Sequence, residues 1–247
     1  VRPPGHSFVH GLTTAGLGAP DYEKALHQHA AYCDALKDCG LDVVTLPADE
    51  AYPDSTFVED TALLTPACAV ILRPGAPSRQ REIESIEPIV RKYFASVERI
   101  ESSGTVDGGD IMMAGSHYYI GLSQRTNSIG AAQLTAILAR HRLTASTVAL
   151  HNVLHLKTAA SYLEHNTMAA TDEIIAQPEF DSFRTVRIEP AEQYAANCLW
   201  INGTVLVADG FPNACAAIAA AGYRTISLDM SEFRKLDGGL SCLSLRF

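Results

Sequence analysis

The stretch DTALLTPACAVILRPGAPSR, residues 60–79, holds two short apolar runs around a Thr-Pro turn and ends in a Gly- and Pro-rich turn. The stretch DIMMAGSHYYIGLSQR, residues 110–125, repeats that order of strand, turn, strand and Gly-containing turn. Both stretches end in an arginine, Arg79 and Arg125, which lie 46 residues apart, and both precede an amphipathic segment. Self-similarity at this period predicts a chain built from repeated modules.

A weaker third copy begins at Cys198, turns at Asn202-Gly203 and reaches an Ala-rich segment after Pro212. The repeated unit is a strand, a strand, a helix and a strand in roughly 50 residues, and the chain of 247 residues has room for about five units. This pattern predicts an α/β fold, a five-bladed α/β-propeller of ββαβ modules around a central active site, in one catalytic domain over residues 1–247. The alternative is an open α/β sandwich with coincidental hairpins.

Helix and strand patterns alternate along the whole chain. The expected helices cover Asp21 to Cys39, Arg81 to Phe94, about Ser128 to His141, and the segment after Pro212. The expected strands are Leu41 to Leu46, Ala69 to Leu72, Tyr118 to Ile120, Thr147 to Leu150, Arg184 to Ile188 and Cys198 to Asn202. The first helix has Asp21 placed as its cap and Gly40 as its stop signal.

The composition predicts a soluble cytoplasmic protein. Net charge is −9, and there is no run of basic residues for nucleic acid or anionic membrane, no apolar run long enough to span a bilayer and no signal peptide. Six scattered cysteines indicate a reduced compartment, and five of them sit in segments where cysteine is usually a small buried hydrophobe. The chain starts at Val1 without an initiator Met, so we expect a short segment, such as a first strand, to precede it.

Four residues stand out as candidates for chemistry. Asp60, Asp107 and His155 recur at intervals of 47 and 48 residues, and Cys242 follows two glycines in DGGLSC. A thiolate, an imidazole and carboxylates are the groups that nucleophilic catalysis uses. The structural alternatives are a buried strand cysteine, a satisfied structural histidine and a simple glycine turn.

Neither a metal nor a dinucleotide cofactor is expected. The Cys, His and Asp residues include no close ligand pair of the kind that zinc sites use. Gly108-Gly109-Asp110 precedes a strand, whereas a dinucleotide fingerprint has three spaced glycines that open a helix.

These motifs resemble those of the dimethylarginine dimethylaminohydrolases, which belong with the arginine deiminases to a superfamily of guanidino-group-modifying α/β-propellers. The resemblance spans nearly the full length in order. It rests on Asp54 to Asp60 (DSTFVED), Arg73 to Arg79 (RPGAPSR), Asp107 to Asp110 (DGGD), Gly121 to Asn127 (GLSQRTN), Leu154 to Lys157 (LHLK) and Asp237 to Cys242 (DGGLSC). It implies a hydrolase of linear amidines that converts mono- and dimethylated arginine to citrulline and an amine without a cofactor.

The resemblance also implies a role for each site residue. Cys242 would be the nucleophile, His155 the general acid and base, and Asp107, where some members carry Glu, the group that orients His155. The implied substrate-binding residues are Asp60 for the guanidinium, Asp54 with main-chain carbonyls near Leu12 and Leu236 for the α-ammonium, Arg79 and Arg125 for the α-carboxylate, and Glu59 in the same pocket with a role not separated from theirs.

Two alternatives stay open at this point. One is an arginine deiminase or citrulline-processing enzyme of the same superfamily, against which the absence of a large helical insertion argues. The other is a non-catalytic module that binds cationic amino acids, against which the presence of Cys242, His155 and Asp107 argues. The expected partner is a small methylated arginine rather than nucleic acid or membrane, and the sequence leaves the oligomeric state open, with a homodimer among the assemblies it allows.

Overall fold

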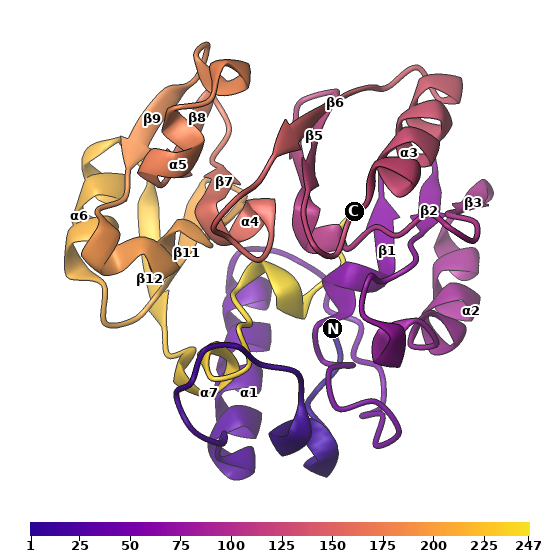
Figure 1. Cartoon of the computed structure of the whole chain (residues 1–247). Coiled ribbons are helices and arrows are strands. Elements are labelled where there is room, and N and C mark those ends of the chain that lie inside the picture. The colour runs from indigo at the N-terminus through magenta and orange to yellow at the C-terminus, as the bar shows by residue number, and fades with distance from the viewer. The chain divides into compact units, whose positions relative to one another are not determined.

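The strand–strand–helix–strand module occurs four times in the computed structural model, which describes all 247 residues. In every module the first two strands pair antiparallel and the last strand joins the second in parallel, so that each module forms one three-stranded sheet (Figure 1). A parallel pair needs a crossover between its strands, and the helix of each module supplies it. The predicted repeat and the α/β class are therefore present.

The chain divides into two compact units. Unit 1 consists of Val1–Phe57 and Thr158–Leu243, and unit 2 consists of Val58–Lys157 and Ser244–Phe247. The modules of unit 2 are β1 (Ala62–Leu64), β2 (Ala69–Ile71), α2 (Ile83–Tyr93) and β3 (Val97–Arg99), then β4 (Ile111–Ala114), β5 (His117–Leu122), α3 (Ser128–Arg140) and β6 (Thr144–Ala149). The modules of unit 1 are β7 (Ala160–Tyr162), β8 (Thr167–Ala170), α5 (Asp172–Ile175) and β9 (Arg184–Arg187), then β10 (Leu199–Ile201), β11 (Thr204–Ala208), α6 (Pro212–Ala220) and β12 (Arg224–Leu228). The remaining α-helices are α1 (Tyr22–Asp38), α4 (Leu156–Ala159) and α7 (Ser231–Arg234).

The helix ends follow the capping signals of the sequence. The Asp21 carboxylate accepts a hydrogen bond from the amide of Lys24 at 2.9 Å, and Gly40 has a φ of +86° just beyond the end of α1. The Asn127 side chain accepts a hydrogen bond from the amide of Gly130 at 2.8 Å and caps the start of α3. None of the helices combines the length and apolarity that crossing a bilayer requires.

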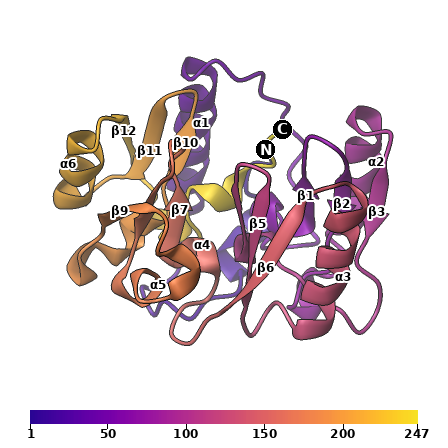
Figure 2. The same cartoon turned by 90° about the horizontal axis from the view of Figure 1, so that it is seen from above.

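Each unit has its own apolar core. In unit 2, Leu134 and Leu138 of α3 pack with Val70 and Ile120 of the sheets, and Figure 2 shows α3 lying along its sheet. In unit 1, every residue of β11 is buried, because Leu206 faces one core cluster and Val205 faces another. Alternate residues of a strand point to opposite faces, so a strand covered on both sides reads as a continuous apolar run.

The predicted strand over Leu41 to Leu46 does not form, so a sheet is present in four of the five expected modules. The amide of Leu46 donates to the carbonyl of Val1 at 2.9 Å, and the Val1 nitrogen donates to the carbonyl of Val44 at 3.0 Å. Pro3 and Pro4 follow Val1 closely in the chain, and proline has no N–H with which to extend this pairing into a strand ladder.

The cysteines are all free. Cys33, Cys68 and Cys198 are buried, as expected for small hydrophobes, whereas Cys39 and Cys215 are partly exposed. Cys242 is also partly exposed.

Candidate active site

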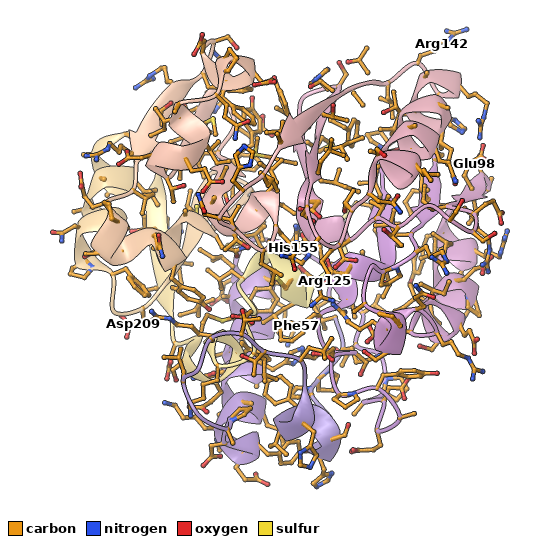
Figure 3. The ribbon with its side chains drawn as sticks, in the orientation of Figure 1. Phe57, Glu98, Arg125, Arg142, His155 and Asp209 are labelled. Atoms are coloured by element: carbon orange, nitrogen blue, oxygen red, sulfur yellow. The ribbon has the colours of Figure 1, made fainter.

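A buried histidine and aspartate form the centre of the site residues in unit 2. Nε2 of His155 lies 3.0 Å from Oδ2 of Asp107, and Oδ1 of Asp107 accepts the amide of Gly75 at 2.7 Å. His155 lies in the segment between β6 and α4, directly before α4, and Figure 3 labels its side chain. Burial by itself lowers the pKa of His155, but the charges of Asp110, Asp60 and Asp107, with the hydrogen bond to Asp107, raise that pKa to about 9. The imidazole is therefore mostly protonated at neutral pH.

The glycines before β4 make room for this histidine. A Cβ on Gly109 would lie 2.7 Å from Nδ1 of His155, and a Cβ on Gly108 would overlap the main-chain carbonyl of Glu59. Both positions therefore need glycine, because the neighbouring groups lie too close to the backbone to leave room for a Cβ atom.

Asp60 is held by Arg79. Its Oδ2 accepts Nη1 of Arg79 at 2.6 Å, and its Oδ1 accepts the amide of Gly109 at 2.8 Å. Burial tends to raise the pKa of Asp60, but the cations Arg79 and His155, with the Gly109 amide, outweigh it and hold that pKa below its ordinary value. Arg79 also forms a two-point contact with Glu82, whose oxygens lie 3.0 Å from Nε and 2.9 Å from Nη2. The sequence did not indicate that Arg79 would bind these two buried acids.

Glu59 is neutralised by two cations of unit 2. Its Oε1 lies 2.6 Å from Nζ of Lys157 and 3.3 Å from Nη2 of Arg246. Its contacts thus make Glu59 part of an ion-pair cluster.

Arg125 differs from Arg79 in its surroundings. It lies on the turn between β5 and α3, where Figure 3 labels it, and is half-buried. Its guanidinium makes no hydrogen bond or ion pair within the chain. An arginine in this state offers all of its donors to an anionic ligand.

In unit 1, three predicted substrate-binding residues come together around Gly11. Oδ1 of the buried Asp54 accepts the amide of Leu12 at 3.0 Å. A Cβ on Gly11 would lie 2.7 Å from the side chain of Leu236 and 2.9 Å from Oδ1 of Asp54. The chain therefore gathers a carboxylate and main-chain groups at one place.

Cys242, also in unit 1, lies in a tight loop. Its Sγ is 3.4 Å from the amide of Gly239, and its own amide donates to the Gly239 carbonyl at 3.2 Å. The side chain of Asn197 braces this loop, because its Oδ1 accepts the amide of Ser241 and its Nδ2 donates to the Ser241 hydroxyl, both at 3.0 Å. A Cβ on Gly239 would lie 2.5 Å from Asn197, which explains the second glycine of DGGLSC.

One group in unit 2 has the spacing of metal ligands: Asp60, Asp107 and His155 offer atoms within 4.8 Å of one another. The four carboxylate oxygens of this group already accept from Arg79, Gly109, Gly75 and His155. Their hydrogen bonds are satisfied without an ion. The expectation of no metal stays a prediction.

The predicted site residues divide between the units. Unit 2 holds Glu59, Asp60, Arg79, Asp107, Arg125 and His155, and unit 1 holds Leu12, Asp54, Leu236 and Cys242. Sequence reasoning missed five polar partners of the site: the buried Glu82 and Asp110, and the partly buried Ser123, Lys157 and Arg246. Asp110, Ser123 and Lys157 fall inside the quoted motifs, so their place in a motif was the available signal, whereas Glu82 and Arg246 carried none.

Comparison with known proteins finds one family model and several relatives that agree with one another. The family model described as arginine deiminase matches residues 50–197. An N(G),N(G)-dimethylarginine dimethylaminohydrolase of Pseudomonas aeruginosa is 53% identical over 248 residues, which cover 100% of this chain and 98% of that protein. An enzyme of the same name from Streptomyces coelicolor is 34% identical over 250 residues, which cover 100% of this chain and 95% of that protein.

Solved structures agree with these relatives. DDAH from Pseudomonas aeruginosa, as a cysteine-to-serine variant complexed with citrulline, superimposes with a TM-score of 0.98 at 53% identity, covering 100% of this chain and 97% of that one. A histidine-to-glycine variant of dimethylarginine dimethylaminohydrolase, an adduct with S-methyl-L-thiocitrulline, matches with the same score and coverage. The N-terminal domain of ArgZ, an arginine dihydrolase from cyanobacteria, matches at a TM-score of 0.87 and 18% identity over 99% of this chain and 96% of that one, which concerns the fold alone. The predicted fold class is confirmed.

Proposed function

The chain belongs to the dimethylarginine dimethylaminohydrolase family, and from that premise we propose that Cys242, His155 and Asp107 carry out its hydrolysis of Nω-methylated arginines. The substrates Nω,Nω-dimethyl-L-arginine and Nω-methyl-L-arginine give L-citrulline and dimethylamine or methylamine. The observation that carries the assignment is the buried pair of His155 and Asp107 beside Asp60. It supplies a proton donor next to a carboxylate that attracts a guanidinium.

The guanidinium carbon resists attack by water because its charge is spread over three nitrogens. In the proposed reaction the thiolate of Cys242 adds to this carbon and forms a tetrahedral centre. His155 then donates a proton to the methylated nitrogen, and the C–N bond breaks to release the neutral amine. A histidine whose pKa is raised to about 9 is in the right protonation state for this step at neutral pH.

The remaining thiouronium on Cys242 is hydrolysed in the second half of the reaction. His155, now neutral, accepts one proton from water as the water attacks the same carbon. When the C–S bond then breaks, the thiolate leaves, and the second proton of that water passes to solvent, where it protonates the released amine and leaves neutral citrulline. Substrate and water supply every atom of the products, so this scheme uses no cofactor.

An amino acid substrate also presents an α-carboxylate and an α-ammonium. We assign the carboxylate first to Arg125, whose guanidinium has no partner in the chain, and second to Arg79, which already contacts Asp60 and Glu82. We assign the α-ammonium to Asp54 with the main chain near Leu12 and Leu236. Asp60 takes the guanidinium, and the cations on Glu59 suggest that it supports this pocket through its ion pairs.

The remaining sequence-based expectations are part of the same proposal. One catalytic domain over residues 1–247 stays a prediction. Six free cysteines support a cytoplasmic location. A homodimer stays a prediction that sedimentation of the purified protein tests.

The experiment that tests the function is a citrulline assay with arginine and with its mono- and dimethylated forms side by side. We expect citrulline from both methylated substrates, together with methylamine or dimethylamine in equal amounts. Citrulline and ammonia from plain arginine, with no turnover of the methylated forms, would instead identify an arginine deiminase. Binding of all three without turnover would identify a non-catalytic module.

A further inference from the structure

Asp110 is a fully buried carboxylate of unit 2 that has no role in the reaction as described so far. It is the last residue of the DGGD motif and lies directly before β4, with none of its surface exposed to solvent. Its Oδ1 accepts the amide of Leu156, the residue after His155, at 3.0 Å. Its Oδ2 accepts the hydroxyl of Ser123 at 2.6 Å.

The direction of the Ser123 hydrogen bond follows from counting its lone pairs. The Ser123 oxygen accepts the amides of Arg125 at 3.0 Å and Thr126 at 3.1 Å. A hydroxyl has two lone pairs and one proton, so the proton is left for Asp110. Both oxygens of Asp110 are therefore acceptors, as in an ionised carboxylate.

Asp110 thus joins two segments that carry proposed site residues. One oxygen holds the main chain next to His155, and the other holds, through Ser123, the turn that carries Arg125. Figure 3 labels His155 and Arg125. The same turn reaches back to Asp107, because the Thr126 hydroxyl accepts the amide of Asp107 at 3.1 Å.

We propose that Asp110 is a positioning residue for the hydrolysis, which sets the acid–base group His155 and the carboxylate-binding Arg125 together. The proposal rests on the function proposed above. A single carboxylate then couples the place where the amine leaves to the place where the α-carboxylate binds.

The charge of Asp110 supports this role. Burial raises the pKa of Asp110, and the His155 cation and the Ser123 hydroxyl oppose that rise. Among the neighbouring groups that raise the pKa of His155, the negative charge of Asp110 has the largest effect. Each group therefore stabilises the charged form of the other.

The first variant is Asp110→Asn, which keeps the size of the side chain. Its amide NH₂ group must face either the Ser123 hydroxyl or the Leu156 amide, and both of these are donors. We expect kcat to fall by about 10²-fold, as for a misplaced acid–base group, and the His155 titration to move to lower pH. The titration is followed by NMR of protein labelled at histidine, which needs no turnover.

The second variant, Ser123→Ala, cuts only the link to the Arg125 turn. We expect it to reduce the preference for methylated arginine over methylated agmatine, which lacks the α-carboxylate, by about tenfold, and to leave the His155 titration unchanged. Thr65→Val is the matched control. The Thr65 hydroxyl likewise accepts two amides of its own turn, those of Ala67 at 3.2 Å and Cys68 at 2.9 Å, but it lies outside this network.

A wild-type substrate preference in Ser123→Ala would overturn the proposal, as would an unchanged His155 titration in folded Asp110→Asn. If Asp110→Asn does not fold, the Ser123→Ala result decides alone. Failure of the wild-type protein to release citrulline would contradict the proposed function, whereas the NMR titration still tests the link between Asp110 and His155.

Discussion

Nε2 of His155 lies 3.0 Å from Oδ2 of Asp107, and both side chains are buried. A carboxylate can only accept at this contact, so the Nε2 atom carries the proton and the ring is fixed in one orientation. The pair therefore controls both the placement and the charge of the proposed general acid.

The pH dependence of turnover is expected to report on this pair. Because the pKa of His155 is raised to about 9, the acid needed to expel the amine is present below that pH and lost above it. Asp107→Asn removes a negative charge and a hydrogen bond, so kcat should fall by about 10²-fold and its alkaline limb should move to lower pH. Asp107→Glu restores the charge and is the control, and an unmoved limb in Asp107→Asn would contradict this account.

Cys242→Ser is expected to stop turnover while substrate still binds, because an alkoxide is far harder to form than a thiolate at neutral pH. Acid quenching of the wild-type reaction, followed by mass mapping, should show a covalent adduct on Cys242. Cys215→Ser is the control, since Cys215 is also partly exposed but lies on α6 beside Thr225. An adduct on any other cysteine would remove Cys242 from the role of nucleophile.

Recognition of the α-carboxylate is expected to depend on Arg125. Charge-assisted hydrogen bonds of this kind contribute about 1.5 to 3 kcal/mol, so methylated agmatine should lose on the order of 10²-fold in kcat/KM relative to methylated arginine. Arg125→Ala should narrow this difference without unpairing any group of the chain. Arg79→Ala should narrow it too, but it also leaves the buried acids Asp60 and Glu82 without their cation and should destabilise the fold.

For these substitutions the exposed Arg81, which pairs with Glu84, provides the control. Arg81→Ala should leave the ratio of the two substrates at its wild-type value. Equal turnover of both substrates by the wild-type enzyme would mean that Arg79 and Arg125 serve the structure or an interface instead.

Stability is expected to fall on mild acidification because of His29, a buried residue of α1. Burial lowers the pKa of His29 to about 4, whereas an unfolded histidine titrates near 6.5. The unfolded state therefore binds the proton first, and the free energy of unfolding should decrease by about 3 kcal/mol as pH falls from 6.5 to 4. Urea unfolding at several pH values measures this slope.

His29→Gln should flatten that slope, and the control is His27→Gln, since His27 is exposed on the same helix. An equal slope in the wild type and in His29→Gln would show that other groups cause the acid sensitivity.

Much of the fold was readable from the sequence because its signals act over a few residues. The repeated arginine turns predicted the modules, and the cap at Asp21 with Gly40 placed α1 to within one residue at each end. The strand expected over Leu41 to Leu46 was wrong because a strand also needs a partner along its length, and Pro3 and Pro4 have no N–H with which to pair.

The motifs also indicated which residue types carry the chemistry, since a nucleophile, an imidazole and acids can be recognised in a linear chain. The hydrogen bonds that these residues form with one another could not be predicted from the linear sequence. The bonds from Arg79 to Asp60, from Asp107 to His155 and from Asp110 to the residue after His155 join positions 19, 48 and 46 apart. Only the path of the chain decides which donors reach a buried carboxylate, because a hydrogen bond requires contact within about 3 Å and burial removes water as the competing partner.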